Sequence, residues 1–123
     1  MLGNTALAFD YREPRYDISF AVYYGHKKFG PMSNYTVNMS MGGVFIETED
    51  ISPPGTEFDV EFMLPDSDTT ITSKARVAWT NEPGKPKNVR LPSGMGLQFL
   101  DLSLKNLRAI RDFLDNGSLM PVW

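Results

Sequence analysis

The chain has 123 residues, of which 41% are hydrophobic and 22% are charged, which is typical of one globular domain with a single modest core. Its 15 acidic and 12 basic residues give a net charge of −3, which disfavours a general DNA- or RNA-binding protein. The absence of cysteine excludes disulfides, thiolate metal sites and cysteine nucleophiles.

Signals for membranes, secretion and metals are also missing from the sequence. No apolar run reaches the roughly 18 to 20 residues that a membrane-spanning helix needs. The N-terminus lacks the pattern of a secretory signal, and a single histidine offers no imidazole cluster for a metal ion. We therefore expect a cytoplasmic protein with no metal, no cofactor and no membrane insertion.

Residues 1–15 show no hydrophobic period and are predicted to form a flexible leader. Pro14 lacks a backbone N–H and disfavours helix at the residue before it. The leader carries Arg12 and Arg15 among carboxylates. Taken alone, the two arginines are explained as solvated side chains that pair loosely with their acidic neighbours.

From Tyr16 the hydrophobic period becomes two, which indicates half-buried strands. The clearest strand alternates Phe58, Val60, Phe62 and Leu64 with acidic residues. Surface charges on neighbouring strands are expected to pair across the sheet. Six strands are predicted in all, at 16–24, 31–37, 44–48, 58–64, 71–79 and 94–100.

Between the second and third of these strands lies Asn38-Met39-Ser40-Met41-Gly42-Gly43. Adjacent glycines mark a turn or a close backbone approach. Asn38 and Ser40 are two residues apart, so on extended backbone they project to the same face. The segment is either a polar hairpin turn, in which these side chains bond only their own backbone, or a site that presents an amide and a hydroxyl together.

Trp79 ends the fifth predicted strand, with the parity of the core-facing residues. The simpler interpretation is that its ring closes one end of the core.

The C-terminal part predicts a long loop and one helix. Residues 81–93 contain three prolines and no alternation, so they form a loop that could contact a partner. Ser103 is a good N-cap, and Leu104, Leu107, Ile110 and Leu114 form an apolar stripe suited to packing over the barrel. A helix-in-groove or dimer contact is the alternative use. Residues 118–123 are predicted to be a frayed tail.

Catalytic patterns are not evident in the sequence. The carboxylates alternate on outer faces or lie in turns, Ser40 has no identifiable base, and Gly42-Gly43 is not followed by the Lys-Ser/Thr of a phosphate-binding loop. We therefore expect no enzymatic activity.

The spacing Asn38-x-Ser40-x-x-Gly43 resembles the (Asp/Asn)-x-Ser-x-x-Gly signature of the PilZ family of bacterial domains. Further similar segments occur in the family's order, so the resemblance covers roughly residues 11–115. It implies a mainly β fold, a six-stranded antiparallel barrel of the split-barrel type with a C-terminal helix. The similar segments are 43–48, 54–56, 62–65, 75–79 and 94–103.

Many PilZ domains bind the bacterial second messenger cyclic di-GMP, and the resemblance implies that ligand here. The family's first motif, Arg-x-x-x-Arg, would place its second arginine at Arg15 and its first at Tyr11, whereas Arg12 is one residue too close. Guanidinium groups can pair with phosphate and with the O6/N7 edge of guanine, and they stack on rings. PilZ domains often carry an aromatic residue near the position of Trp79, close to the ligand, so its ring could keep one edge buried and offer the other. The ligand-binding residues that the resemblance implies are Arg12, Arg15, Asn38, Ser40, Gly43 and Trp79.

The sequence thus predicts a leader at 1–15, a PilZ-like barrel with its helix at 16–117 and a tail at 118–123. The predicted function is a cyclic di-GMP receptor or adaptor in bacterial signalling, with a protein partner in signalling or motility machinery. The chain is expected to be a monomer or a weak homodimer. The alternative is an interaction module that does not bind the nucleotide because Tyr11 replaces the first arginine.

Overall fold

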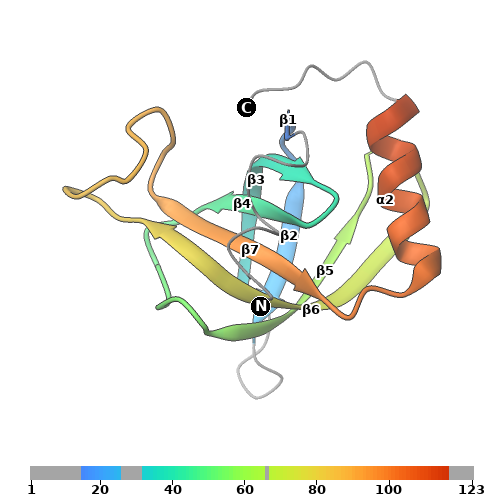
Figure 1. Ribbon diagram of the computed structural model, residues 1–123, viewed down its shortest axis with the longest axis horizontal. Helices are drawn as coiled ribbons and strands as arrows, with labels where there is room; N and C mark the ends of the chain where they lie inside the picture. Colours follow the sequence, from blue (N-terminus) through green and yellow to red (C-terminus); the bar gives the residue numbers. More distant parts are fainter. Residues whose placement is uncertain (1–14, 26–31, 66, 117–123) are drawn as a thin grey trace, which may run out of the picture.

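The computed structural model describes residues 15–25, 32–65 and 67–116. They form seven strands and a C-terminal helix, arranged around one core (Figure 1). The elements are β1 (Tyr16–Asp17), β2 (Ala21–Gly25), β3 (Met32–Ser40), β4 (Gly43–Glu47), β5 (Glu57–Met63), β6 (Thr70–Asn81), β7 (Gly94–Leu100) and α2 (Leu104–Asn116).

The strands close into a barrel. Their order is β1-β3-β2-β5-β6-β7-β4, every pair is antiparallel, and β4 also pairs with β3. Six strands, β2 to β7, therefore form a closed ring without free edges, and the two-residue β1 adds to β3 outside it. The predicted fold, a six-stranded antiparallel barrel with a C-terminal helix, is confirmed.

The predicted strand at 16–24 is split in two by the side chain of Thr36. Its hydroxyl donates to Ile18 O at 2.7 Å and accepts from Phe20 N–H at 3.1 Å. The hydroxyl thus replaces a backbone bond between β3 and the segment that joins β1 to β2, both of which pair with β3. The hydrophobic alternation nevertheless continues across the break, because Phe20, Val22 and Tyr24 are all buried.

The barrel interior is filled by the residues whose alternation predicted the strands. Phe58, Val60 and Phe62 of β5 are at most 4% exposed, and Met95 and Leu97 of β7 are fully buried. Edge-to-face and stacked rings link the strands inside the barrel. On the outside, the expected cross-strand ion pairs are present, between Lys74 and Asp59 at 3.2 Å and between Arg76 and Glu57 at 3.3 Å.

Trp79 does not lie on the core face, so that prediction was wrong. Val77 pairs with Leu97, but Trp79 pairs with Gly96, because the register of β6 shifts between them. The bulge inserts one extra residue and reverses the parity of the residues after it, which turns Trp79 outward. A period-two pattern cannot reveal such an insertion.

Helix α2 lies beside β5 and β6 in Figure 1 and packs on the barrel through one face. Ser103 caps it as predicted: its Oγ accepts from Asn106 N–H at 3.1 Å, and its backbone O accepts from Leu107 N–H. Ile110 and Leu114 are buried, but Leu104 is 60% exposed and does not belong to the packed stripe.

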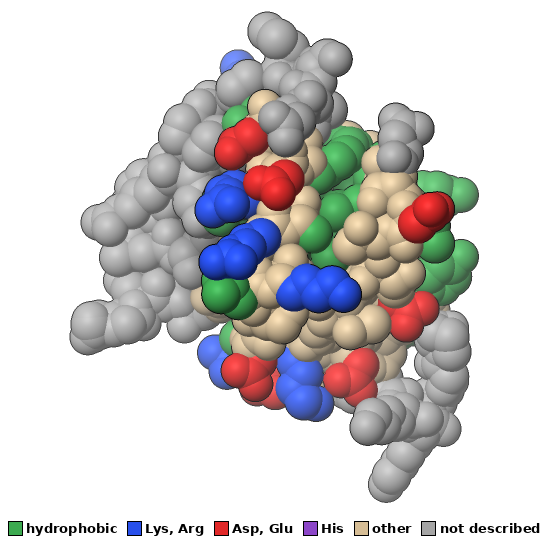
Figure 2. All heavy atoms as spheres, turned by 90° about the vertical axis from the view of Figure 1, so that its right-hand side faces the viewer, with side chains coloured by type: hydrophobic (Ala, Val, Ile, Leu, Met, Phe, Trp, Pro, Cys, Tyr) green, Lys and Arg blue, Asp and Glu red, His purple; other side chains and the backbone are tan. Residues whose placement is uncertain are grey.

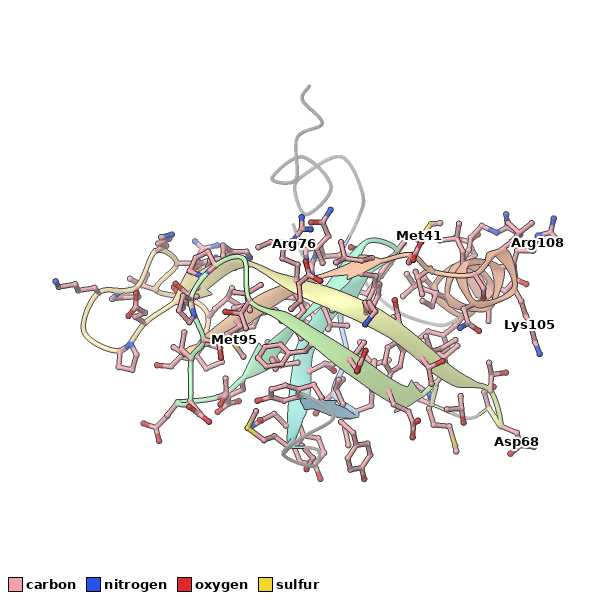
Figure 3. All side chains as sticks on the ribbon, turned by 90° about the horizontal axis from the view of Figure 1, so that it is seen from below. Met41, Asp68, Arg76, Met95, Lys105 and Arg108 are labelled. Atoms are coloured by element: carbon pink, nitrogen blue, oxygen red, sulfur yellow. The ribbon has the colours of Figure 1, made fainter. Side chains whose placement is uncertain are left out.

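The outer side of α2 is charged. Figure 2 shows the side of the molecule that carries the helix, with Lys and Arg side chains interspersed with Asp and Glu. Lys105 and Arg108 point away from the barrel (Figure 3).

The loop after β6 is organised by one buried side chain, Asn81, which is 1% exposed. Its amide Nδ2 donates to three backbone carbonyls at 3.0–3.2 Å, and its Oδ1 accepts from Asn88 N–H at 2.9 Å. The three carbonyls belong to Asn88, Leu91 and Pro92. The loop that the sequence predicted as irregular is thus fixed from inside.

Replacing Asn81 with alanine is expected to lower the free energy of unfolding by about 2 kcal/mol, because a buried polar group left without its partner costs roughly 1 to 3 kcal/mol. Urea denaturation monitored by tryptophan fluorescence measures the change. Asn88→Ala, at an exposed position, keeps the backbone groups that Asn81 contacts and is expected to cost less. An equal loss for both variants would contradict the central role of Asn81.

Candidate ligand-binding site

The Asn38-x-Ser40-x-x-Gly43 motif joins β3 to β4 in a tight hairpin. Met39 points into the core and is fully buried, so Asn38 and Ser40 on either side of it point outward. Ser40 Oγ accepts from Gly42 N–H at 3.1 Å, and Gly42 O accepts from Phe99 N–H of β7 at 2.9 Å. The turn interpretation is therefore correct for the backbone, but it does not account for all that these side chains bind.

Arg15 bonds both motif side chains. Its Nε donates to Asn38 Oδ1 at 2.7 Å, and one terminal nitrogen donates to Ser40 Oγ at 3.1 Å. The amide oxygen and the hydroxyl together fix the position and plane of the guanidinium. We expected Asn38 and Ser40 to meet a ligand directly, whereas in this structure they hold an arginine that is only part-buried.

Strand pairing extends the motif into a continuous outer face. Residues paired across antiparallel strands share a face, so two rows of outward residues cross β3, β4, β7 and β6. At about 4.8 Å per strand, each row covers about 14 Å of sheet. The first row is Asn38, Phe45, Gly96 and Trp79, and the second is Ser40, Gly43, Gln98 and Arg76.

The first row contains an aromatic pair. Phe45 and Trp79 lie on either side of Gly96, with ring centroids 5.2 Å apart and planes inclined by 34°. Because Gly96 has no side chain, the two rings can meet above the backbone of β7. Phe45 is only 1% exposed, so the accessible apolar surface next to the motif belongs to the part-exposed Trp79.

The second row is polar. Arg76 points away from the barrel (Figure 3), and its guanidinium bonds Glu57. Gln98 lies between Arg76 and Gly43. Of the expected site residues that the structure describes, all lie on or against this face: Arg15, Asn38, Ser40, Gly43 and Trp79.

Sequence reasoning missed Phe45, Gln98 and Arg76 as members of the face. Phe45 lies in the apolar run Val44-Phe45-Ile46, whose uniform hydrophobicity does not show which side chain points outward. All three residues are at most 1% exposed in the structure. The signal that could have found Gln98 was its place two residues after Gly96, opposite the core residues Leu97 and Phe99.

The sequence of this chain is similar to that of a known family of domains. A family profile described as PilZ domain matches residues 10–116, which is most of the chain. The chain belongs to the PilZ domain family. A search of curated proteins found no match.

A solved structure of similar fold is that of the Bacillus subtilis inhibitor of motility, MotI/DgrA. The two align with a TM-score of 0.65 at 19% sequence identity, over 87% of this chain and 52% of the other. The chain therefore spans about half the length of that protein. At this identity the likeness supports the barrel fold alone.

The arginine motif of PilZ domains is only partly covered by the structure. Arg15, at the second arginine position, is described and contacts the signature residues. Arg12 and Tyr11 lie outside the described residues, as do most of the predicted leader and the tail. The signature and the second arginine of this PilZ domain thus form one hydrogen-bonded unit.

A cleft of about 500 Å³ lies at the other end of β3 and β4, away from the signature. Its lining includes Glu47, Glu49 and Tyr35, so an anionic ligand would meet two carboxylates there. Nearby, burial raises the pKa of the Tyr24 phenol, whose hydroxyl donates to Asn34 at 2.6 Å. The cleft suits a phosphate-bearing ligand less well than the outer face does.

Two further observations concern the described part of this PilZ domain. Within it, no group of three or more His, Cys, Asp or Glu side chains is placed to hold a metal ion. No helix there is long and apolar enough to cross a membrane.

Proposed function

We propose that this chain is a receptor for cyclic di-GMP that acts by binding and not by catalysis. The observation that carries the proposal is Arg15, which Asn38 and Ser40 hold on the face that also presents Trp79. An arginine fixed by two hydrogen bonds loses less freedom when it binds an anion.

The chemistry of the outer face suits the two parts of this ligand. Cyclic di-GMP is a dianion with two guanine bases, and guanidinium can bond phosphate oxygens or the O6/N7 edge of guanine. Trp79 is part-exposed and offers ring surface on which a base can stack, which contributes about 1 to 3 kcal/mol per base, and the buried Phe45 ring packs beside it. Gly43 has no side chain, so a ligand that reached the motif could approach the backbone of β4 closely.

In this proposal Asn38 and Ser40 are positioning residues. Each uses its oxygen to accept from Arg15, and the Asn38 amide nitrogen can still donate to a ligand. Arg12, three residues before Arg15, would supply the second cation in place of the arginine that Tyr11 replaces. The loaded domain would then act on a protein partner as a signalling adaptor in the cytoplasm.

The second candidate is an interaction module that has lost the nucleotide. Tyr11 favours it, because tyrosine is neutral at pH 7 and cannot pair bidentately with phosphate. A motility protein as partner is suggested by the solved structure of similar fold, which is named as an inhibitor of motility.

Isothermal titration of the purified chain with cyclic di-GMP separates the two candidates, with GTP and cyclic GMP as controls. We expect saturable binding of the dinucleotide alone. A titration by fluorescence of the two tryptophans accompanies it, because binding enthalpy can be near zero. No binding by either method at about 100 μM ligand would limit the affinity to about −5.5 kcal/mol and favour the interaction module.

A further inference from the structure

Gln98 occupies the centre of the second row on the outer face. It lies on β7 between Gly43 of β4 and Arg76 of β6. Its neighbours along the strand, Leu97 and Phe99, belong to the core, so its own side chain points outward.

The carboxamide oxygen of Gln98 is buried and lacks a donor among the residues that the structure describes. Most buried polar atoms in folded proteins have a hydrogen-bond partner, so an exception calls for a cause. The neighbouring Arg76 bonds Glu57 and does not donate to Gln98 Oε1 in this structure. Gln98 Oε1 is therefore an acceptor placed on the outer face with its hydrogen bond still to be made.

The surroundings of this acceptor match one edge of a planar, hydrogen-bonding ligand. Gly43 beside it and Gly96 two residues before it are buried but carry no side chains, so no Cβ stands next to the carboxamide on these two sides. The Phe45–Trp79 aromatic pair lies in the adjacent first row, on either side of Gly96. The last side-chain torsion of glutamine is broad, so the carboxamide can turn toward a bound base.

We infer that Gln98 is a specificity-determining residue, whose Oε1 accepts from the N1–H and 2-amino groups of a guanine base. The inference rests on the proposed function and identifies the base edge that the site reads. Adenine presents an acceptor, N1, at the position of the guanine N1–H, so it would oppose Oε1 where guanine bonds it. A site built to bond a donor rejects analogues that lack it.

The test compares cyclic di-GMP with cyclic di-IMP, whose hypoxanthine bases lack the 2-amino group, on the unchanged chain and on Gln98→Leu. The unchanged chain is expected to bind cyclic di-GMP about tenfold more tightly, which corresponds to the loss of one hydrogen bond. Gln98→Leu is expected to bind both ligands equally, with about a hundredfold weaker affinity for cyclic di-GMP, because the variant loses both hydrogen bonds to guanine.

Stability gives an independent readout. Gln98→Leu removes a buried acceptor that lacks a partner, so its unfolding midpoint in urea is expected to be unchanged or higher, while its affinity falls. A merely structural role would lower both. Gln98→Met, an unbranched apolar side chain, replaces the leucine variant if that one does not fold. Thr72→Val, at an exposed position on β6, is the matched control and is expected to leave both quantities unchanged.

The outcomes separate the inference from the proposed function. If the unchanged chain does not bind cyclic di-GMP, the proposed function fails and this inference fails with it. If the unchanged chain binds both dinucleotides equally, or if Gln98→Leu keeps the preference for guanine, the receptor stands and the role of Gln98 is wrong.

Discussion

Replacing Arg15 with alanine is expected to weaken cyclic di-GMP binding by at least about a hundredfold. Hydrogen bonds to charged groups contribute about 1.5 to 3 kcal/mol each, and a guanidinium can form two with one phosphate or guanine edge. The variant also leaves Asn38 and Ser40 without the partner that they bond in this structure. Titration of the variant beside the unchanged chain measures the loss.

Two variants show whether the geometry of Arg15 or only its charge matters. Arg15→Lys keeps the charge but cannot bond Asn38, Ser40 and a ligand with one planar group, so we expect it to recover little affinity. Arg108→Ala removes an arginine from the outer side of α2 and should leave binding unchanged (Figure 3). Unchanged affinity of Arg15→Ala would exclude Arg15 from the site.

Alternation in the sequence predicted the strands, and the resemblance to PilZ domains predicted that they form a barrel. Phe58, Val60 and Phe62 are buried as their spacing required, and so are Met95 and Leu97 of a second such strand. Two irregularities were invisible. The side chain of Thr36 interrupts β1 and β2, and a bulge before Trp79 reverses its face. Both depend on pairing with a distant strand, which local pattern does not encode.

The candidate site was predictable only in part, for the same reason. The spacing of Asn38 and Ser40 put them on one face whatever the fold, because extended backbone alternates. That Phe45, Gln98 and Arg76 share this face depends on the registers of β4, β7 and β6. Those strands are brought together by closure of the barrel, so only the structure shows the two rows as one surface.

The helix shows how neighbouring contacts decide between equally apolar residues. Leu104 fitted the predicted stripe, but it is the first residue of α2 and remains 60% exposed. Leu102, just before the cap, packs against the core instead, together with Phe113 near the other end. An apolar spacing of three or four indicates a helix and a buried face, but the end of that face depends on what it meets.

Gly94→Ala is expected to lower the free energy of unfolding by about 3 kcal/mol. A methyl group at Gly94 would overlap the carbonyl oxygen of Ile46 and lie 2.9 Å from the ring of Phe45. Backbone of β4 cannot yield without breaking its pairing with β7, and overpacking of this kind typically costs about 1 to 3 kcal/mol or more. Urea denaturation measures the change in the free energy of unfolding, provided that the slope of this free energy against urea concentration is the same for the variant and the unchanged chain.

Gly84→Ala is the control for glycine replacement as such. Gly84 has a φ of +81° and open space around its Cβ position, so alanine there meets only backbone strain, about 1 to 2 kcal/mol. A loss at Gly94 no larger than this would contradict the steric argument. Because the Phe45 ring also contacts Trp79, any shift that relieves Gly94→Ala moves the aromatic pair. In the receptor that we propose, the folded variant should therefore also bind cyclic di-GMP less tightly than Gly84→Ala does.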